Sequence, residues 1–258
     1  MVELAITAGR QTLTRFGQSD LAVDRKSDDS PVTAADRDAE QLTRDALAIR
    51  FPEDAVAGEE FGDKPGQNDY RWTIDPIDGT KSFICGVPLY STLLALELGE
   101  QPIAGAIIIP ALAQAVVATA GHGCFCSQDL SRFQRCHVSS QRELSQAVFV
   151  TSEAKTFGER ASDRSGGDGA LFDRLQAATW LTRTWGDGYG YLMVATGRAD
   201  LMVDPICNAW DVAAMVPIMN EAGGRFTDWR GEPSVRGGDG LGTNGHLHEE
   251  VLALLQSP

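Results

Sequence analysis

Two aspartates, Asp75 and Asp78, form the strongest chemical signal in this sequence. They belong to the segment Asp-Pro-Ile-Asp-Gly-Thr at residues 75–80, in which the proline stiffens the turn and lets both carboxylates converge on a hard cation. The Gly-Thr pair that follows offers backbone amides and a hydroxyl group to a phosphate oxygen. The segment therefore predicts an anion site beside a cation site.

Further carboxylates could complete a metal site around this segment. Glu59 lies in Gly-Glu-Glu just after an apolar stretch, and Asp211 follows a tryptophan far downstream. A single aspartate is more often a helix cap or a turn residue, because its side chain bonds readily to nearby backbone. Mg²⁺, however, needs only a few carboxylates, since it keeps several waters and accepts phosphate oxygens as ligands. The grouped acidic residues thus indicate Mg²⁺ and a phosphate substrate.

The chain resembles the inositol-monophosphatase-like, Mg²⁺-dependent phosphatases in several separated motifs. These occur in the family's order and span nearly the whole chain: Pro-Val-Thr-Ala-Ala-Asp at 31–36, Gly-Glu-Glu at 58–60, residues 75–80, Trp-Asp-Val-Ala-Ala at 210–214 and Glu-Ala-Gly-Gly at 221–224. Three more are most similar to the histidinol-phosphate phosphatase branch: Lys-Ser-Phe at 81–83, Trp-Gly-Asp-Gly-Tyr-Gly-Tyr at 185–191 and Ala-Thr-Gly-Arg-Ala-Asp at 195–200.

Matching these motifs residue by residue implies roles at a reaction centre. The implied ligands of two or three Mg²⁺ ions are Glu59, Asp75, the backbone carbonyl of Ile77, Asp78 and Asp211. Asp36 and Thr80 would orient and help to deprotonate an attacking water, with Glu59 assisting. The amides of Gly79 and Thr80 would hold the phosphate. The alternative for Thr80 is a residue that only forms the turn.

The candidate substrate contacts extend beyond the phosphate, and they are Asp78, Gly79, Thr80, Arg183, Asp187, Asp204 and Asp211. By resemblance, Asp204 faces the alcohol part of the substrate. Asp187 either contacts substrate or caps a helix that starts at Gly188, and the cap is slightly favoured. Arg183 falls on the apolar face of a short strand, where its charge needs a carboxylate or the substrate as a partner. Lys26 is either a phosphate contact or a solvated surface residue.

The cysteines and the composition limit the other classes of function. Cys124 and Cys126, with Cys136 and His137, could be drawn as a zinc site, but their spacing favours packing in a hairpin. An odd count of 5 cysteines favours a reducing compartment, with the cytoplasm as the default. A net charge of −14 argues against nucleic acid or an anionic membrane as the main partner.

Hydrophobic periodicity predicts an α+β fold. Helices are expected at 2–16, 36–51, 188–196, 209–222 and 246–255, the last capped from Asn244, and strands at 70–74, 90–98, 102–110, 114–119, 148–152, 179–185 and 224–229. Residues 159–170 are expected to form a surface loop. The resemblance implies a more specific fold, a layered αβαβα sandwich. We expect a single phosphatase domain over residues 1–258, with two intimate lobes at roughly 1–140 and 141–258.

The sequence therefore predicts a Mg²⁺-dependent phosphomonoesterase, and the resemblance favours hydrolysis of L-histidinol phosphate to L-histidinol and phosphate in histidine biosynthesis. Its partner would be a small phosphate monoester, and the resemblance implies a homodimer. The nearest alternative is an inositol-1-phosphate phosphatase. An alternative of another class is a binding protein that keeps the fold and acts through a regulatory role.

Overall fold

Two β-sheets form the framework of the chain, which a computed structural model describes over residues 1–19, 21–25, 31–163 and 170–257. The expected phosphate contact Lys26 lies outside the described residues. In the described part of the chain, no helix has the length and apolar character needed to cross a membrane.

The first sheet has seven strands in the order β3-β4-β5-β6-β7-β8-β9. They are Ala55–Gly58, Tyr70–Asp78, Ser91–Leu98, Gln101–Ile109, Gln114–Thr119, Gly123–Ser127 and Gln134–Arg135. Strands β3 and β4 run parallel, and all the other neighbours are antiparallel. The meander expected between residues 90 and 119 is confirmed as β5, β6 and β7. Strand β4 continues beyond the expected 70–74 and carries both Asp75 and Asp78.

The second sheet has five strands in the order β11-β10-β12-β14-β13. They are Leu181–Arg183, Val148–Val150, Leu201–Asp204, Gly240–Thr243 and Arg225–Thr227. Strand β10 runs parallel to both of its neighbours, whereas β14 is antiparallel to both of its own. The two sheets lie on either side of residue 140 in the sequence. The division of one domain into two lobes there stays a prediction.

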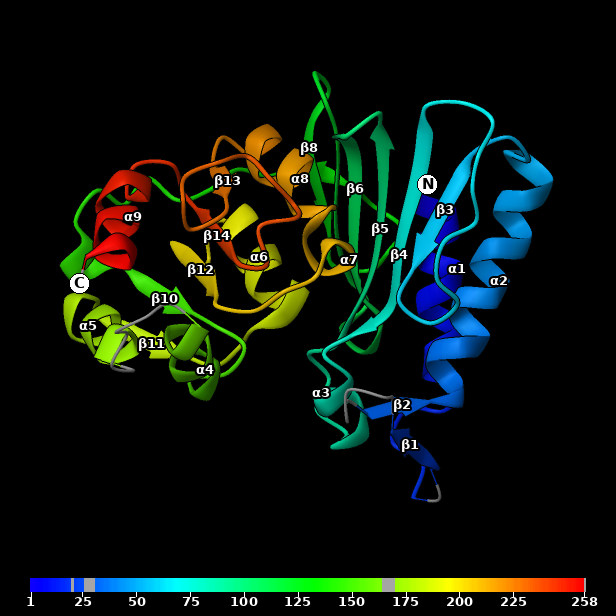
Figure 1. The fold of residues 1–258 in the computed structure, drawn as a ribbon, viewed down its shortest axis with the longest axis horizontal. Helices are drawn as coiled ribbons and strands as arrows, with labels where there is room; N and C mark the ends of the chain where they lie inside the picture. Colours follow the sequence, from blue (N-terminus) through cyan, green and yellow to red (C-terminus); the bar gives the residue numbers. More distant parts are fainter. Residues whose placement is uncertain (20, 26–30, 164–169, 258) are drawn as a thin grey trace.

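Helices cover both sheets and separate them (Figure 1). The outer face of the first sheet packs on α1 (Val2–Leu13) and α2 (Ala34–Arg50) through a core that includes Leu4, Leu47 and Ile74. Between the sheets lie α6 (Asp187–Ala195) and α8 (Met215–Glu221), whose core residues meet both sheets. The second sheet is covered outside by α4 (Lys155–Asp163), α5 (Ala170–Ala178) and α9 (His248–Gln256). These five layers confirm the expected α+β αβαβα sandwich.

The shorter elements lie in the connections between these layers. They are the two-stranded sheet of β1 (Val23–Arg25) and β2 (Pro31–Thr33), the helices α3 (Thr80–Ile84) and α7 (Ala209–Val212), and the 3₁₀ turns η1 (Pro110–Leu112) and η2 (Leu144–Gln146). Helix α3 directly continues the 75–80 segment, and α7 carries Asp211.

Three expected elements differ from the structure. Helix α9 begins at His248 with Leu247 as its N-cap, so the cap expected from Asn244 is wrong, although Asn244 Oδ1 accepts from the amide of Leu247 at 3.2 Å. The single helix expected at 209–222 is broken into α7 and α8, because Pro217 lacks an amide hydrogen and its ring would clash with the carbonyl of Ala213. The loop expected at 159–170 is wrong for 159–163, which belong to α4, and for Ala170, which begins α5. Buried Phe157 anchors α4 in the core, and an ion pair from Arg160 to the buried Asp239 ties the helix to the segment before β14. Residues 164–169 lie outside the described residues.

His248 gives the fold a pH dependence that can be measured. Its ring is buried and bonds Thr243 Oγ1 at 2.9 Å and Thr227 Oγ1 at 3.0 Å. Burial lowers its pKa to about 4, so the folded state favours the neutral ring. The resulting stability is fully present above the ordinary His pKa of about 6.5 and is lost as the pH falls toward the folded value.

We expect the parent protein to lose about 2 kcal/mol more unfolding free energy between pH 7 and pH 5 than His248→Gln loses. Urea unfolding of both proteins at the two pH values measures this difference, and the variant corrects for the carboxylates that titrate in the same range. Equal losses in the two proteins would show that His248 does not titrate on unfolding.

Candidate active site

A bulge in β4 brings Asp75 and Asp78 to the same side of the strand. The pairing with β5 runs to Asp75 opposite Leu93 and then shifts, so that Asp78 lies opposite Ser91. In a regular strand, side chains three residues apart point to opposite faces, and the extra residue of a bulge removes this alternation. The bulge contains Pro76, which has no amide hydrogen to contribute to the ladder.

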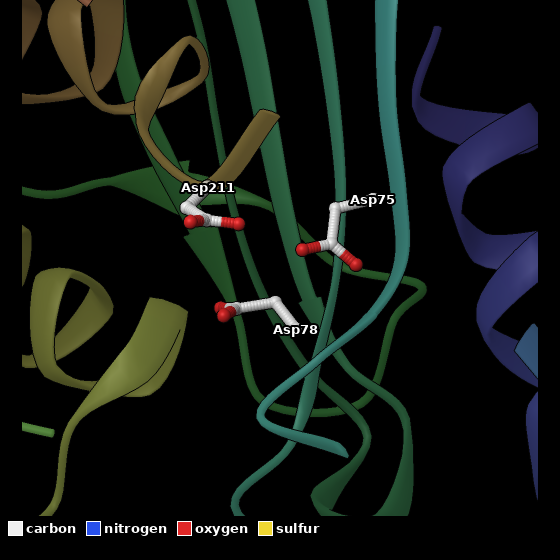
Figure 2. Close-up of side chains that lie close together, drawn as sticks. All are labelled: Asp75, Asp78 and Asp211. Atoms are coloured by element: carbon white, nitrogen blue, oxygen red, sulfur yellow. The ribbon is translucent and has the colours of Figure 1, made fainter. Parts of the chain in front are cut away.

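Asp211 completes a group of three carboxylates with Asp75 and Asp78 (Figure 2). One potential ligand oxygen from each side chain lies within 4.8 Å of the other two. Asp211 is fixed from the start of α7, where its Oδ2 accepts a 2.6 Å hydrogen bond from the amide of Asn208. Glu59 follows β3, which runs parallel to β4, and its charge reaches Asp75.

The carboxylates repel one another in a buried setting. Burial, followed by the charges of Glu59, Asp78 and Asp211, raises the pKa of Asp75 well above its ordinary value. The pKa of Asp78 rises in the same way, first through burial. Burial also raises the pKa of Asp211 to about 7. Since such repulsion is relieved by a multivalent cation and carboxylate oxygens are the ligands that Mg²⁺ prefers, these residues fit a magnesium site.

Asp36 offers a buried oxygen close to this group. Its Oδ2 accepts hydrogen bonds from the amide of Thr33 at 2.8 Å and from the Thr33 hydroxyl at 2.7 Å, which completes the cap of α2. Its Oδ1 is buried and has no hydrogen-bond partner among the described residues. The charge of Glu59 contributes to the raised pKa of Asp36, although burial is the larger cause. Asp36 is not one of the residues that line the cavity described below.

The turn after β4 places Gly79 and Thr80 at the start of α3. Gly79 has φ of 82°, and a Cβ atom built there would lie 2.5 Å from Asp187 Oδ2. Glycine is therefore required both by the left-handed backbone and by the close approach of Asp187. The hydroxyl of Thr80 donates to the carbonyl of Ile77 at 3.1 Å.

Asp187 lies against the turn and does not act as the favoured helix cap. Helix α6 begins at Asp187 with Gly186 as its N-cap, and no side-chain cap bond forms there. The backbone of Asp187 has φ of 53°, a strained value for an aspartate, and its amide donates to Ser152 Oγ at 3.0 Å. The carboxylate thus lies against Gly79 instead of capping α6.

A cavity of about 400 Å³ opens over these groups, between the ends of the two sheets. Its lining includes all but one of the candidate substrate contacts: Asp78, Gly79, Thr80, Asp187, Asp204 and Asp211. Asp204 ends β12, and its Oδ1 accepts a 2.6 Å hydrogen bond from Ser152 Oγ. Burial raises the pKa of Asp204 to about 7.

Arg183 does not belong to this cavity, and its expected place on an apolar strand face is wrong. Its side chain is exposed on the edge strand β11, and its guanidinium lies 5.9 Å from the ring centroid of Trp185. Its Nη1 donates to the neighbouring carbonyl of Thr182. An edge strand leaves a charge in contact with water, so alternation with apolar residues did not imply burial.

Two lining residues, Ser152 and Glu153, lie outside every motif of the sequence. Lys81 and Tyr191 also line the cavity and belong to the 81–83 and 185–191 motifs, but no role was predicted for them. Lys81 pairs with Glu153 at 2.6 Å. Ser152 follows the end of β10, and its position after a strand was the only available signal.

The cysteines at the far end of the first sheet form a packed group. Cys124 and Cys126 lie on β8, and Cys136 follows β9, with its Sγ 3.5 Å from that of Cys124. All three are buried in the core between the sheet and the middle helices, as hairpin packing predicts.

Comparison with known proteins places these features in a family pattern. The model of the inositol monophosphatase family matches residues 1–257. A histidinol-phosphatase of Chlorobaculum parvum is 43% identical over 98% of this chain and 94% of that protein. A histidinol-phosphatase of Streptomyces coelicolor is 42% identical over the same shares. The solved structure of the extragenic suppressor protein SuhB from Bartonella henselae has a TM-score of 0.89 at 27% identity, covering 100% of this chain and 97% of that one.

Position 79 favours glycine for two reasons, the left-handed backbone and the close approach of Asp187, and their energetic costs can be measured separately. Gly86 also has a left-handed backbone, with φ of 70°, but nothing lies within 4 Å of a Cβ atom built there. Gly86→Ala therefore carries only the backbone cost, whereas Gly79→Ala adds the collision with Asp187. We expect Gly79→Ala to lower the unfolding free energy by at least about 1 kcal/mol more than Gly86→Ala does. Chemical denaturation of the two variants measures this, and equal losses would contradict the close approach of Asp187.

Proposed function

Because the chain belongs to the inositol monophosphatase family, we propose that it is a Mg²⁺-dependent phosphomonoesterase that hydrolyses L-histidinol phosphate to L-histidinol and phosphate in histidine biosynthesis. The carboxylate group of Asp75, Asp78 and Asp211 carries the proposal for the chemistry. Similarity to histidinol-phosphatases over 98% of the chain supports the choice of substrate.

The proposed metal site uses oxygen atoms from three parts of the chain. Two or three Mg²⁺ ions would be held by Glu59, Asp75, the carbonyl of Ile77, Asp78 and Asp211. When bound, Mg²⁺ supplies the positive charge that neutralises the phosphate and acidifies the attacking water. Without that charge, a protein of net charge −14 would repel a phosphate ester.

The chain's own residues then hold the phosphate and the water. The amides of Gly79 and Thr80 lie at the start of α3 and would donate to phosphate oxygens. The unpartnered Oδ1 of Asp36 would accept a proton from the water, since its other oxygen is already held by Thr33. Thr80 would orient the same water through its hydroxyl, whose proton is directed to the carbonyl of Ile77.

The leaving alcohol would lie at the Asp204 end of the cavity. Histidinol carries an ammonium group, which pairs with a carboxylate more strongly than the neutral hydroxyls of inositol do. Asp187, which lies against Gly79, would contact the substrate closer to the ester bond. Arg183 lies outside the cavity and would not contact the substrate in this arrangement.

The proposed setting of the enzyme is a homodimer in the cytoplasm. The resemblance to the family implies the dimer. All five cysteines are free, which suits a reducing compartment.

A phosphate-release assay with Mg²⁺ tests the choice of substrate. We expect kcat/KM for L-histidinol phosphate to exceed that for inositol 1-phosphate by at least about tenfold, because the partly desolvated pair of an ammonium and Asp204 contributes 1.4 kcal/mol or more. Asp204→Asn should reduce this preference and leave a small generic phosphomonoester much less affected. A preference for inositol 1-phosphate would favour the alternative enzyme.

Asp78→Asn tests whether the chain acts as an enzyme or as a binding protein that keeps the fold. The asparagine oxygen can still accept from the Ser91 hydroxyl, which bonds Asp78 Oδ2 at 2.7 Å, so the fold should survive. Phosphate release should fall by at least about a hundredfold, because one charge is removed from the metal site. Circular dichroism and thermal unfolding serve as the controls. Activity within about threefold of the parent at saturating Mg²⁺ would remove Asp78 from the site.

A further inference from the structure

The hydroxyl of Tyr191 is buried and makes no close hydrogen bond among the described residues, although the Asp204 side chain interacts with it. The side chain is 1% exposed. Leaving such a group unsatisfied costs about 1–3 kcal/mol, and an unsatisfied group in a native protein calls for an explanation.

Tyr191 lies on the wall of the cavity next to Asp204. Burial is the main cause that raises the pKa of Tyr191 well above its ordinary value, and the charge of Asp204 is the next. The hydroxyl therefore stays protonated and faces a carboxylate whose Oδ1 is already bonded to Ser152. The Tyr191 hydroxyl and the Asp204 carboxylate thus line the same cavity, and each has an oxygen atom with spare acceptor capacity.

The ring of Tyr191 is held in place by two glycines of β14. A Cβ atom built at Gly240 would lie 2.7 Å from Tyr191 Oη, and one built at Gly242 would lie 2.9 Å from its Cδ1 and Cε1 atoms. Phe226 packs beside the ring with 6.0 Å between the centroids. The strand leaves space for this ring and fixes its hydroxyl before any ligand arrives, which is the arrangement that gives specificity at low entropic cost.

We propose that the Tyr191 hydroxyl and the Asp204 carboxylate form an acceptor pair that binds the ammonium group of the substrate's leaving alcohol, which makes Tyr191 a specificity-determining residue. An ammonium group has three N–H donors and can serve both oxygens at once. A site built around polar groups that stay unpaired without the right ligand discriminates strongly against analogues that lack the matching donor. The inference rests on the proposed phosphomonoesterase activity and narrows its substrates to esters of amino alcohols.

Tyr191→Phe removes the hydroxyl and keeps the ring. Tyr189→Phe is the matched control, because Tyr189 lies on the same helix, is half-buried and does not line the cavity. The substrates are L-histidinol phosphate, together with O-phosphoethanolamine and ethyl phosphate, which differ only in the ammonium group. We expect Tyr191→Phe to lower the preference for O-phosphoethanolamine over ethyl phosphate, and kcat/KM for L-histidinol phosphate, by about tenfold. Tyr189→Phe should change neither.

Thermal unfolding and calorimetry separate this role from a structural one. Removing a buried hydroxyl that makes no close hydrogen bond should leave the melting temperature of Tyr191→Phe equal to or above that of the parent. Titration of L-histidinol into the Mg²⁺-loaded protein should show about tenfold weaker binding to Tyr191→Phe than to the parent, whatever the rate of turnover.

The outcomes distinguish the inference from the proposed function. If the parent hydrolyses ethyl phosphate and O-phosphoethanolamine equally well, or if Tyr191→Phe changes neither the preference nor L-histidinol binding, the inference is overturned while the phosphomonoesterase activity stands. Equal losses on all the substrates, or a lower melting temperature, would make the hydroxyl a structural group and would also overturn it. If the parent hydrolyses none of the esters, the proposed function fails, and L-histidinol binding alone then decides the role of Tyr191.

Discussion

Repulsion among buried carboxylates is the constraint on which the rest of this structure depends. Asp75, Asp78 and Asp211 are held together in spite of their like charges, and Glu59 adds to the repulsion. The raised pKa values of these carboxylates show that bound protons relieve part of this repulsion when no metal is present. The bulge in β4 and the start of α7 hold the side chains in place, so the carboxylates are positioned before a cation binds.

Helix capping and catalysis share residues in this fold. Asp36 and Asp211 are both third residues of capping boxes, and each gives one oxygen to the amide of its N-cap residue, Thr33 or Asn208. The second oxygen of each is directed elsewhere, and that of Asp36 stays unpartnered. A cap and a functional group were alternatives when only the sequence was considered. In the structure the cap is what fixes the functional oxygen.

The elements and the acidic motifs could be predicted from the sequence because both are local. Periodicity located most helices and strands, and the spacing of the motifs located the carboxylates. Contacts between the sheets could not be predicted in this way. The approach of Asp187 to Gly79 joins residues more than a hundred positions apart, and the space for Tyr191 is created by glycines on another strand. Arg183 was misplaced because alternation along a strand does not show whether the strand lies at an edge.

The same electrostatic constraint explains why the two ends of the cavity would bind different cations. Asp204 is buried and feels the charges of Asp187 and Asp211, yet it does not belong to the carboxylate group that could share a metal. Ser152 and Tyr191 supply it with neutral hydrogen bonds only, which stabilise a buried carboxylate only partly. Under the proposed function, its counter-charge would arrive with the substrate. A cationic leaving alcohol meets that need and a neutral polyol does not, so one negatively charged cavity would use Mg²⁺ at the phosphate and an ammonium group at the alcohol.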